Sequence, residues 1–237
     1  TVTNDVTGTP DVDLSTAITL SGTSAIHLRI TDDAGNVGTA DTTSYILDTT
    51  APTISFSSVD ISADTGTAAD DFNTKTAAQT LTATLSAAMA SDDILKVSVD
   101  AGSSWSTVTS DVTGSPDVSL STAITLAGTS AIHLQITDDA GNAGTADTTS
   151  YILDTTAPTI SFSSVDISAD TGSSATDFIT KTAAQTLTGT LSAAMEGDDI
   201  LKVSVDAGSS WSTVTNDVTG TPDVDLSTAI TLSGTSA

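Results

Sequence analysis

The sequence has no cysteine and almost no positive charge. Five lysines and arginines stand against 30 acidic residues, so the formal net charge of the 237 residues is −25. Without cysteine the chain forms no disulfide, thiolate metal site or cysteine nucleophile. So acidic a chain repels phosphate backbones, and we do not expect nucleic acid as a partner. An apolar run of about 18 residues is also missing, so we expect no membrane insertion.

Aromatic residues are scarce as well, at 3% of the chain, yet 38% of the residues are hydrophobic. Acidic disordered chains lack Val, Ile and Leu in ordered patterns. Here these residues recur in alternating runs throughout the sequence. The composition therefore favours a folded protein with an acidic surface.

The sequence repeats itself with a period of 106 residues. Residues 51–106 match residues 157–212 at all but seven positions, and residues 1–50 match residues 107–156 at all but six. A segment of this length can bury a core of its own, unlike the short units of a solenoid. We therefore expect independent beads on a string, taken from a longer array.

Hydrophobic and polar residues alternate in every strong segment of the repeat, and this period of two predicts β-strands with no helix. The parity changes at Ser57-Ser58, which indicates a β-bulge or a switch between sheets. We expect Trp105 to point into the core. The alternating sets are Ile54 and Phe56; Val59 and Ile61; Leu81, Ala83 and Leu85; Leu95, Val97 and Val99; Ile124 and Leu126; Ile132, Leu134 and Ile136; Tyr151 and Leu153.

About seven short antiparallel strands in about 100 residues are typical of the immunoglobulin-like β-sandwich. The predicted fold class is therefore all-β, with such sandwiches linked end to end. Asp-Thr-Thr-Ala-Pro at 48–52 and 154–158 predicts linkers, because proline enforces extended geometry. The expected domains are residues 1–50, the C-terminal half of a repeat; residues 51–156, one complete repeat; and residues 157–237, a repeat without its last two strands.

The motifs resemble those of a known family. Asp-Asp-Ala-Gly-Asn between two strands, followed by Leu-Asp-Thr-Thr-Ala-Pro, resembles bacterial immunoglobulin-like repeats. Ser-Ala-Asp-Thr-Gly at 62–66 and 168–172, followed by Asp-Phe, resembles the extender repeats of giant calcium-dependent repeats-in-toxin-type adhesins. The resemblance covers the whole chain. It implies an extracellular, load-bearing stalk for adhesion and biofilm formation on a Gram-negative cell surface, secreted by a type I system.

The aspartates are the candidate cation ligands. Calcium takes six to eight oxygens, and a short Asp side chain in a loop lets carbonyl oxygens join the same shell. Strand parity places some of these loops at each end of the repeat, so each linker is flanked by carboxylates of two repeats. The candidate Ca²⁺ ligands are Asp48, Asp154, Asp64, Asp170, Asp71, Asp177, Asp92, Asp93, Asp198, Asp199, Asp32, Asp33, Asn36, Asp138, Asp139 and Asn142.

A local role for the same residues stays open, because Asp also forms turns without any cation. Two observations favour ligands: Asp outnumbers Glu 29 to 1, and adjacent Asp-Asp pairs repel unless something neutralises them. The copies discriminate further. Asp70 is Thr176 in the next copy and Asp13 is Ser119, so neither is a good candidate.

No catalytic constellation is present, so we do not expect an enzyme. His27 and His133 occur once per repeat, without the partners that a zinc site or a catalytic dyad needs. Thr80, Thr82 and Thr84 predict a solvated outer strand face. The first hypothesis is thus a structural extender of a surface adhesin, stiffened by calcium at the linkers; the alternative is a repeated ligand-binding module for glycan, ice or a host surface. The expected partners of the protein are the neighbouring repeats of the same chain, and contacts between chains could complete the two half-repeats.

Overall fold

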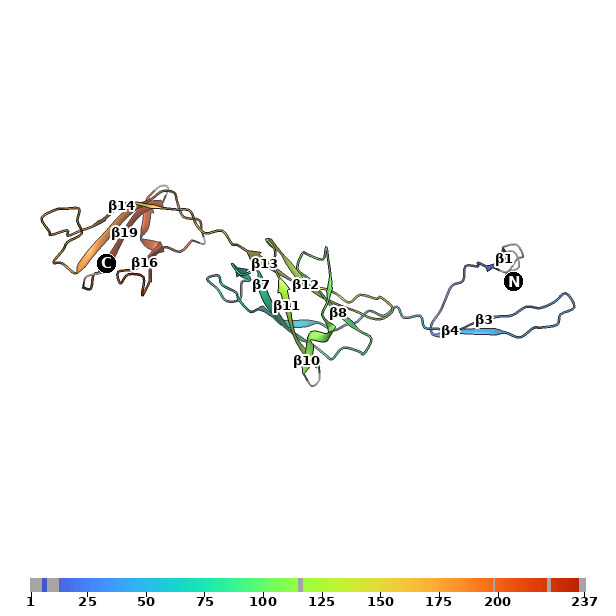
Figure 1. Cartoon of the computed structure of the whole chain (residues 1–237). Coiled ribbons are helices and arrows are strands. Elements are labelled where there is room, and N and C mark those ends of the chain that lie inside the picture. The colour runs from blue at the N-terminus through green and yellow to red at the C-terminus, as the bar shows by residue number, and fades with distance from the viewer. Residues whose placement is uncertain (1–5, 8–12, 115–116, 198, 221–222, 235–237) are drawn as a thin grey trace. The chain divides into compact units, whose positions relative to one another are not determined.

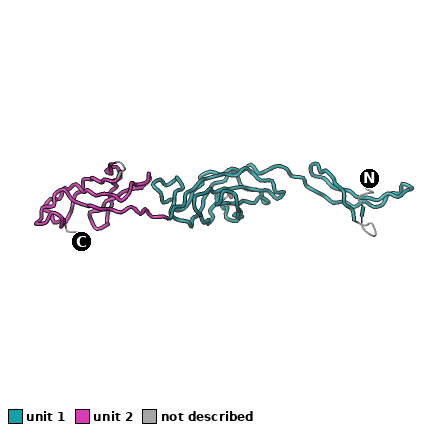
Figure 2. Tube along the Cα trace, turned by 90° about the horizontal axis from the view of Figure 1, so that it is seen from above, with its two compact units in different colours: residues 1–155 teal, residues 156–237 magenta. Residues whose placement is uncertain are grey.

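A computed structural model describes residues 6–7, 13–114, 117–197, 199–220 and 223–234. Figure 1 shows strands and loops throughout. The helical elements in the described residues are two three-residue 3-10 turns, η2 (Thr109–Asp111) and η3 (Thr215–Asp217). The all-β prediction is confirmed. Two compact units, residues 1–155 and 156–237, are coloured separately in Figure 2.

The complete repeat is a sandwich of two sheets. The first has the order β10 (Val112–Gly114), β11 (Asp117–Thr125), β7 (Ala78–Leu85), β5 (Phe56–Ile61). The second has the order β6 (Asn73–Thr74), β13 (Asp147–Leu153), β12 (Thr129–Thr137), β8 (Ile94–Ser98), β9 (Ser106–Thr107). The long strands follow the two-sheet arrangement of immunoglobulin domains, with β5, β7 and β11 in one sheet and β8, β12 and β13 in the other.

The alternation in the sequence becomes the two faces of each strand. In β7, Gln79, Leu81, Ala83 and Leu85 are buried, whereas the threonines between them are exposed, as predicted. Tyr151 of β13 is fully buried, and its hydroxyl donates a hydrogen bond to Val99 O at 2.7 Å. One hydrophobic cluster contains side chains from both sheets and runs from Ile61 to Tyr151. The repeat thus has its own core.

The parity change in β5 is a β-bulge. The register with β7 shifts between Ser57 and Asp60, and Ser58 has a φ of 50°. Unit 2 has the same bulge, where Ser164 has a φ of 52°. The chain crosses to the second sheet later, through residues 62–72. Of the two alternatives for Ser57-Ser58, a β-bulge or a switch between sheets, the β-bulge is therefore confirmed.

Two features of the repeat differ from the sequence prediction. Trp105 does not enter the core; it is 37% exposed, because the turn before it ends the parity of β8. Its indole N–H donates to Gly102 O at 3.1 Å, and its ring lies beside that of His133, tilted by 60° with centroids 6.1 Å apart. Strand β6 was not predicted; its two residues pair with Ile152 and Leu153, far along the chain, in parallel.

The residues before the complete repeat form two small sheets. β1 (Val6–Thr7) pairs with β2 (Asp13–Leu14). β3 (Ser24–Leu28) and β4 (Asp41–Tyr45) form an antiparallel pair, which we call the N-terminal hairpin. Several large apolar side chains in and beside this hairpin, such as Leu28 and Ile46, are exposed, whereas Ile26 and Tyr45 are half-buried.

Unit 2 contains one full sheet and a fragment of a second. The full sheet has the order β14 (Phe162–Ile167), β15 (Ala184–Leu191), β19 (Asp223–Thr231), β18 (Val218–Gly220), and the fragment pairs β16 (Lys202–Val203) with β17 (Ser212–Thr213). Its buried hydrophobic cluster has four members, Leu191, Leu201, Val214 and Leu226. Unit 2 therefore has a much smaller core than the complete repeat.

Candidate functional site

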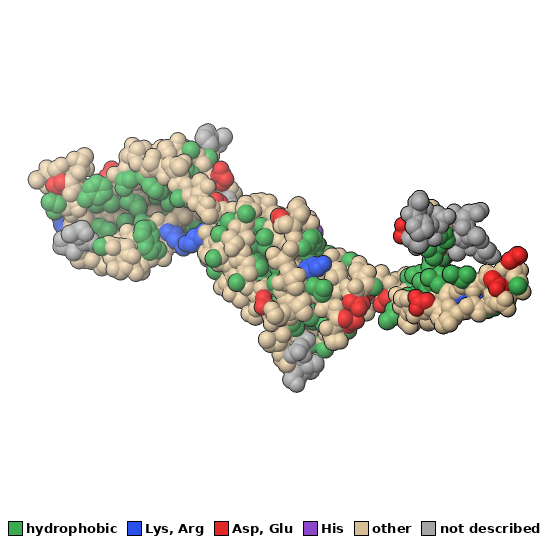
Figure 3. Space-filling view, turned by 45° about the vertical axis from the view of Figure 1, so that its right-hand side comes forward, with side chains coloured by type: hydrophobic (Ala, Val, Ile, Leu, Met, Phe, Trp, Pro, Cys, Tyr) green, Lys and Arg blue, Asp and Glu red, His purple; other side chains and the backbone are tan. Residues whose placement is uncertain are grey.

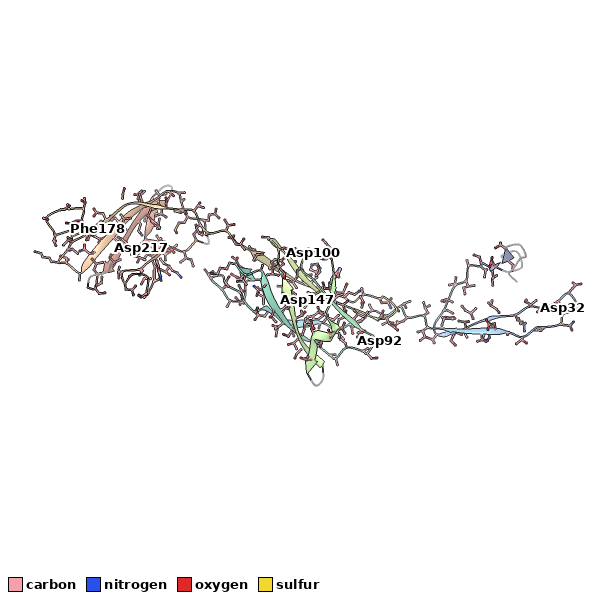
Figure 4. All side chains as sticks on the ribbon, in the orientation of Figure 1. Asp32, Asp92, Asp100, Asp147, Phe178 and Asp217 are labelled. Atoms are coloured by element: carbon pink, nitrogen blue, oxygen red, sulfur yellow. The ribbon has the colours of Figure 1, made fainter. Side chains whose placement is uncertain are left out.

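Strand register assigns each loop of the complete repeat to one of its ends. Phe56 pairs with Leu85 and Ile94 pairs with Thr137, so the loops 86–93 and 138–146 lie where the chain enters the repeat. The pairing of Leu153 with Thr74 places residues 62–72 where the chain leaves it. Figure 4 shows Asp92 at the entry end, whereas Asp64, Asp70 and Asp71 lie within residues 62–72 at the exit end. Both ends of the sandwich therefore carry aspartates.

A buried glutamine positions residues 62–72, which we call the exit-end loop. Gln79 Oε1 accepts a hydrogen bond from Ala63 N at 2.8 Å, and its Nε2 donates to Thr76 O at 2.7 Å. Within the loop, Asp64 Oδ2 accepts from Phe72 N at 2.9 Å. Asp71 Oδ1 accepts from Asn73 N at 3.0 Å. Backbone amides thus hold the two carboxylates in fixed orientations.

One carboxylate oxygen in this loop is buried and has no hydrogen-bond partner. It is Asp64 Oδ1, and its counterpart Asp170 Oδ1 is in the same state in unit 2. Leaving a charged oxygen buried and unpaired costs more than leaving a neutral group, so such an atom calls for a bound partner. A hard cation coordinated by oxygen would supply one. The oxygen donors of this loop therefore fit calcium.

Gly66 allows the loop to close around these carboxylates. A Cβ added at this position would lie 2.9 Å from Asn73 O and 3.2 Å from Asp71 Oδ1. Any side chain at residue 66 would push this part of the loop away from Asp71 and Asn73. The described residues contain no group of three or more His, Cys, Asp or Glu side chains that could hold a metal ion. A calcium ion here would need carbonyl and water oxygens besides Asp64 and Asp71.

The exit linker starts beside the same loop. Asp154 N donates to Thr74 O at 2.9 Å, and Thr74 Oγ1 donates to Ala63 O at 2.5 Å. The structure therefore brings Asp64, Asp71 and Asp154 to one end of the repeat. In unit 2, Phe178 N and Ile179 N bind Asp170 and Asp177 in the same way, at 3.0 and 3.1 Å.

The carboxylate of Asp138 is occupied by its own turn. Its two oxygens accept from Asn142 N at 2.7 Å and Asn142 Nδ2 at 2.9 Å, and these bonds lower the pKa of Asp138. Asp32 and Asn36 form the same pair, with both bonds at 2.7 Å, and the pKa of Asp32 is lowered for the same reason. The geometry gives these two aspartates a local role as turn formers.

The entry linker has a direct contact with the repeat. Asn142 Nδ2 also donates to Asp48 O at 3.1 Å, and Asp48 Oδ1 accepts from Thr50 N at 2.9 Å. A Cβ on Gly144 would lie 2.7 Å from Pro52 O, so only glycine permits this approach. These contacts hold the linker to the 138–146 loop without a cation.

The remaining candidates lie in short turns. Asp93 Oδ2 accepts from Ala90 N at 2.8 Å, and Asp199 Oδ2 accepts from Glu196 N at 2.9 Å. Asp33, Asp92 and Asp139 are exposed. Asp198 lies outside the described residues. A ligand role for the predicted aspartates therefore stays a prediction.

Two aspartates outside the predicted set, Asp100 and Asp206, have a strongly lowered carboxyl pKa. Asp100 accepts from the side chain and the backbone of Ser104 and from Ser98 Oγ, and these bonds lower its pKa to about 2. Asp206 is held by Ser210 and Ser204 in the same way, and its pKa is also lowered to about 2. The signal in the sequence is a serine two residues before and another four residues after each aspartate.

No family model and no curated protein matches the chain. Among solved structures, one is described as the crystal structure of a tetra-tandem repeat in the extending region of a large adhesion protein. The match covers 89% of this chain and 48% of that one, at 18% identity and a TM-score of 0.27. The chain thus spans about half the length of that structure, and so low a TM-score carries no weight for function. Among the described residues, no helix has the length and apolarity to cross a membrane.

Proposed function

We propose that the chain is part of the extender region of a bacterial cell-surface adhesin, where tandem sandwiches separate a distal adhesive region from the cell. The observation that carries the proposal is the direction of the chain through the complete repeat. Register puts the entry linker and the exit linker at opposite ends of the sandwich. Each copy in such an array adds its full length, as in other quasi-one-dimensional repeat proteins.

Near-identity of the copies supports a spacer over a set of distinct binding domains. The seven differences between residues 51–106 and 157–212 leave the alternating strand intact, since Gln185, Gly189 and Leu191 are buried like Gln79, Ala83 and Leu85. In a spacer the number of copies matters and individual surfaces do not. The net charge of −25 also keeps neighbouring chains apart in solution.

The role of calcium in the proposal is to fix the exit end of each repeat. Asp64 and Asp71 would hold the ion together with carbonyl oxygens of the loop, and Asp154 starts the linker beside them. Binding would neutralise the buried oxygen of Asp64 and stabilise the repeat in proportion to RT ln(1 + [Ca²⁺]/Kd). The entry end would rely on the hydrogen bond between Asn142 and Asp48.

Small-angle X-ray scattering on three consecutive copies of residues 51–156 tests this proposal. In millimolar calcium we expect a maximum dimension roughly three times that of one copy. In excess chelator it should shrink or broaden. The matched control replaces Asp64 by Asn in every copy and should behave as in chelator under both conditions. Identical profiles with and without calcium would leave a passive spacer; a compact particle in calcium would contradict the extender itself.

A repeated ligand-binding module is the second candidate, and one observation favours it. Trp105 is 37% exposed and Trp211 is 61% exposed, so each copy presents an aromatic ring at the same place. Exposed aromatics serve as binding platforms. A panel of glycans should bind the chain and lose affinity in the double variant Trp105→Ala, Trp211→Ala if this function is correct.

A further inference from the structure

The two linkers of the complete repeat are the points at which tension on the chain enters and leaves it. The entry linker continues into β5, the exit linker follows β13, and the register places them at opposite ends of the sandwich. Figure 3 shows the entry linker as one narrow strand of chain beside the broad sandwich. Force on a tethered chain therefore enters the repeat along β5 and leaves it along β13.

The last residues of β13 are bonded to β6 and to the residue before it. Ile152 N donates to Phe72 O at 3.0 Å, and Asp154 N donates to Thr74 O at 2.9 Å. The two strands run parallel to one another. The exit linker thus begins at a residue whose own amide is bonded to β6.

Strand β6 is also joined by the covalent chain to both strands that receive force at the entry end. It follows β5 through residues 62–72 and precedes β7 through residues 75–77, and β5 and β7 are paired with each other. Tension that enters along β5 therefore reaches β6 directly. The route to β13 through β12 is longer, because it must first cross the pairing of β7 with β11.

The parallel arrangement decides how the bonds between β6 and β13 are loaded. Tension pulls β6 towards the entry end and β13 towards the exit end, so the two strands are sheared along their common direction. The evenly spaced bonds of a parallel pair then share the load. They do not open one after another, as the bonds of a hairpin do when its two ends are pulled apart.

Buried side chains hold β6 in place against this pull. Thr74 is 2% exposed, and its Oγ1 donates to Ala63 O at 2.5 Å. Gln79 of β7 donates from Nε2 to the same oxygen at 3.1 Å. The ring of Phe72 is buried in the core. The same anchor recurs in unit 2, where Thr180 Oγ1 donates to Ala169 O at 2.6 Å.

We propose that residues 72–74 and 152–154 form the force-bearing contact of each repeat, which we call the exit clamp. The inference rests on the proposed extender role, because a stalk that holds an adhesive region away from the cell is pulled at both ends. The clamp keeps the exit linker attached to β6 until both backbone bonds break, and only then can β13 leave its sheet. It assigns Thr74 and Gln79 a mechanical role besides their role in packing.

Pulling single molecules of the 237-residue chain in an optical trap tests the clamp. The chain has no cysteine, so handles can be attached at Thr49→Cys and Thr155→Cys, which replace exposed linker residues. Excess chelator makes the result independent of the calcium proposal. Asp154→Pro removes the N–H that binds Thr74 O and should raise the unfolding rate at a fixed force roughly tenfold. Asp154→Asn is the matched control, because it also removes the carboxylate but keeps this N–H, and it should unfold at the parent rate.

A second attachment separates the clamp from a general stabilising role. Handles at Thr49→Cys and Lys75→Cys pull β5 and β6 but not β13, and Lys75 is exposed directly after β6. In this geometry Asp154→Pro should leave the rate unchanged. Thr74→Val, which removes the anchoring hydroxyl, provides a second variant and should raise the rate between the two linkers roughly tenfold as well.

Two results would overturn the exit clamp. One is an equal unfolding rate for Asp154→Pro and Asp154→Asn between the two linkers. The other is a rise of the same size in both pulling geometries, which would make the bond an ordinary contribution to stability. A compact particle in the scattering experiment would instead contradict the extender role, whatever the trap measures.

Discussion

The complete repeat and unit 2 contain almost the same residues but differ in what they bury. Phe72 is 9% exposed, whereas its counterpart Phe178 is 47% exposed. The bulge, the exit-end loop and the Ser-Asp-Ser turn are present in both copies. Local hydrogen bonds are therefore encoded within a few residues, whereas closure of the core depends on strands from the end of the repeat.

The largest expected loss of stability comes from the residue that differs most in burial between the two copies. Phe72→Ala should lower the free energy of unfolding of the complete repeat by about 3 kcal/mol, because it removes a buried aromatic ring from the core. Phe178→Ala should cost unit 2 about 1 kcal/mol, since its ring is half exposed. Urea titrations of dilute protein can follow each copy by one tryptophan, with Trp211→Phe isolating Trp105 and the reverse. Equal losses would contradict the difference in packing.

Calcium should stabilise both copies, because both contain the exit-end loop. At a calcium concentration of about 100 times Kd, the complete repeat should gain about 2.7 kcal/mol of stability. Asp64→Asn should abolish the gain at the Trp105 reporter and leave that at Trp211, where Asp170 is intact. Asp70→Asn is the control, because Asp70 is Thr176 in the other copy. A gain that survives Asp64→Asn would rule out this loop as the site.

The hydroxyl of the buried Tyr151 should contribute more to stability than the hydroxyl of its less buried counterpart, Tyr45. Tyr151→Phe should cost about 1 to 2 kcal/mol, because it leaves Val99 O without its hydroxyl donor. The Tyr45 hydroxyl bonds to Ser21 O at 3.3 Å in a more exposed setting. Tyr45→Phe should therefore change the stability by less than about 0.5 kcal/mol. Both values come from the same urea titrations, and a large effect of Tyr45→Phe in the monomer would contradict the exposed hairpin.

The smallest effect should be the same in both copies. Hydrogen bonds from serines hold the pKa of Asp100 and of Asp206 at about 2 in the folded state, below the ordinary carboxyl value. A lowered folded pKa means that the contribution to stability is full above the unfolded pKa and is lost as the pH falls towards 2.

Asp100→Asn should therefore reduce the acid sensitivity of the Trp105 signal between about pH 4 and pH 2. Ser104→Ala, which removes the main donor, should move the loss to higher pH. The corresponding variants in unit 2 should have the same effects on Trp211. A different response in the two copies would mean that this turn senses the closure of the sandwich.

Features set by neighbouring residues could be predicted from the sequence. The alternation from Leu81 to Leu85 gave β7, and the parity change at Ser57-Ser58 gave the bulge. Strand β6 could not be predicted, because Asn73 and Thr74 have no alternation and pair only through a distant partner. Trp105 was predicted inward because parity was continued across a turn whose Ala101 has a φ of 56°.

The candidate site was predictable only in part. Strand parity gave the ends at which the aspartates lie. It could not distinguish Asp138, whose oxygens are satisfied by Asn142, from Asp64, whose Oδ1 has no partner. That distinction depends on Gln79, which binds the loop from the neighbouring strand β7, and on how closely Gly66 approaches Asn73 and Asp71 in space. The ligand role of these aspartates stays a prediction.

The pairing of β6 with β13 also sets the order in which a repeat can fold during synthesis. Asn73 must wait for Ile152, which leaves the ribosome last, so the sandwich closes only when nearly the whole copy has emerged. Contacts this distant in sequence make folding slow. Successive copies then expose unfinished sheets of nearly identical sequence at the same time, a setting that favours misassembly between repeats. Aspartate-rich surfaces that repel one another would delay such exchange until each copy has closed on itself.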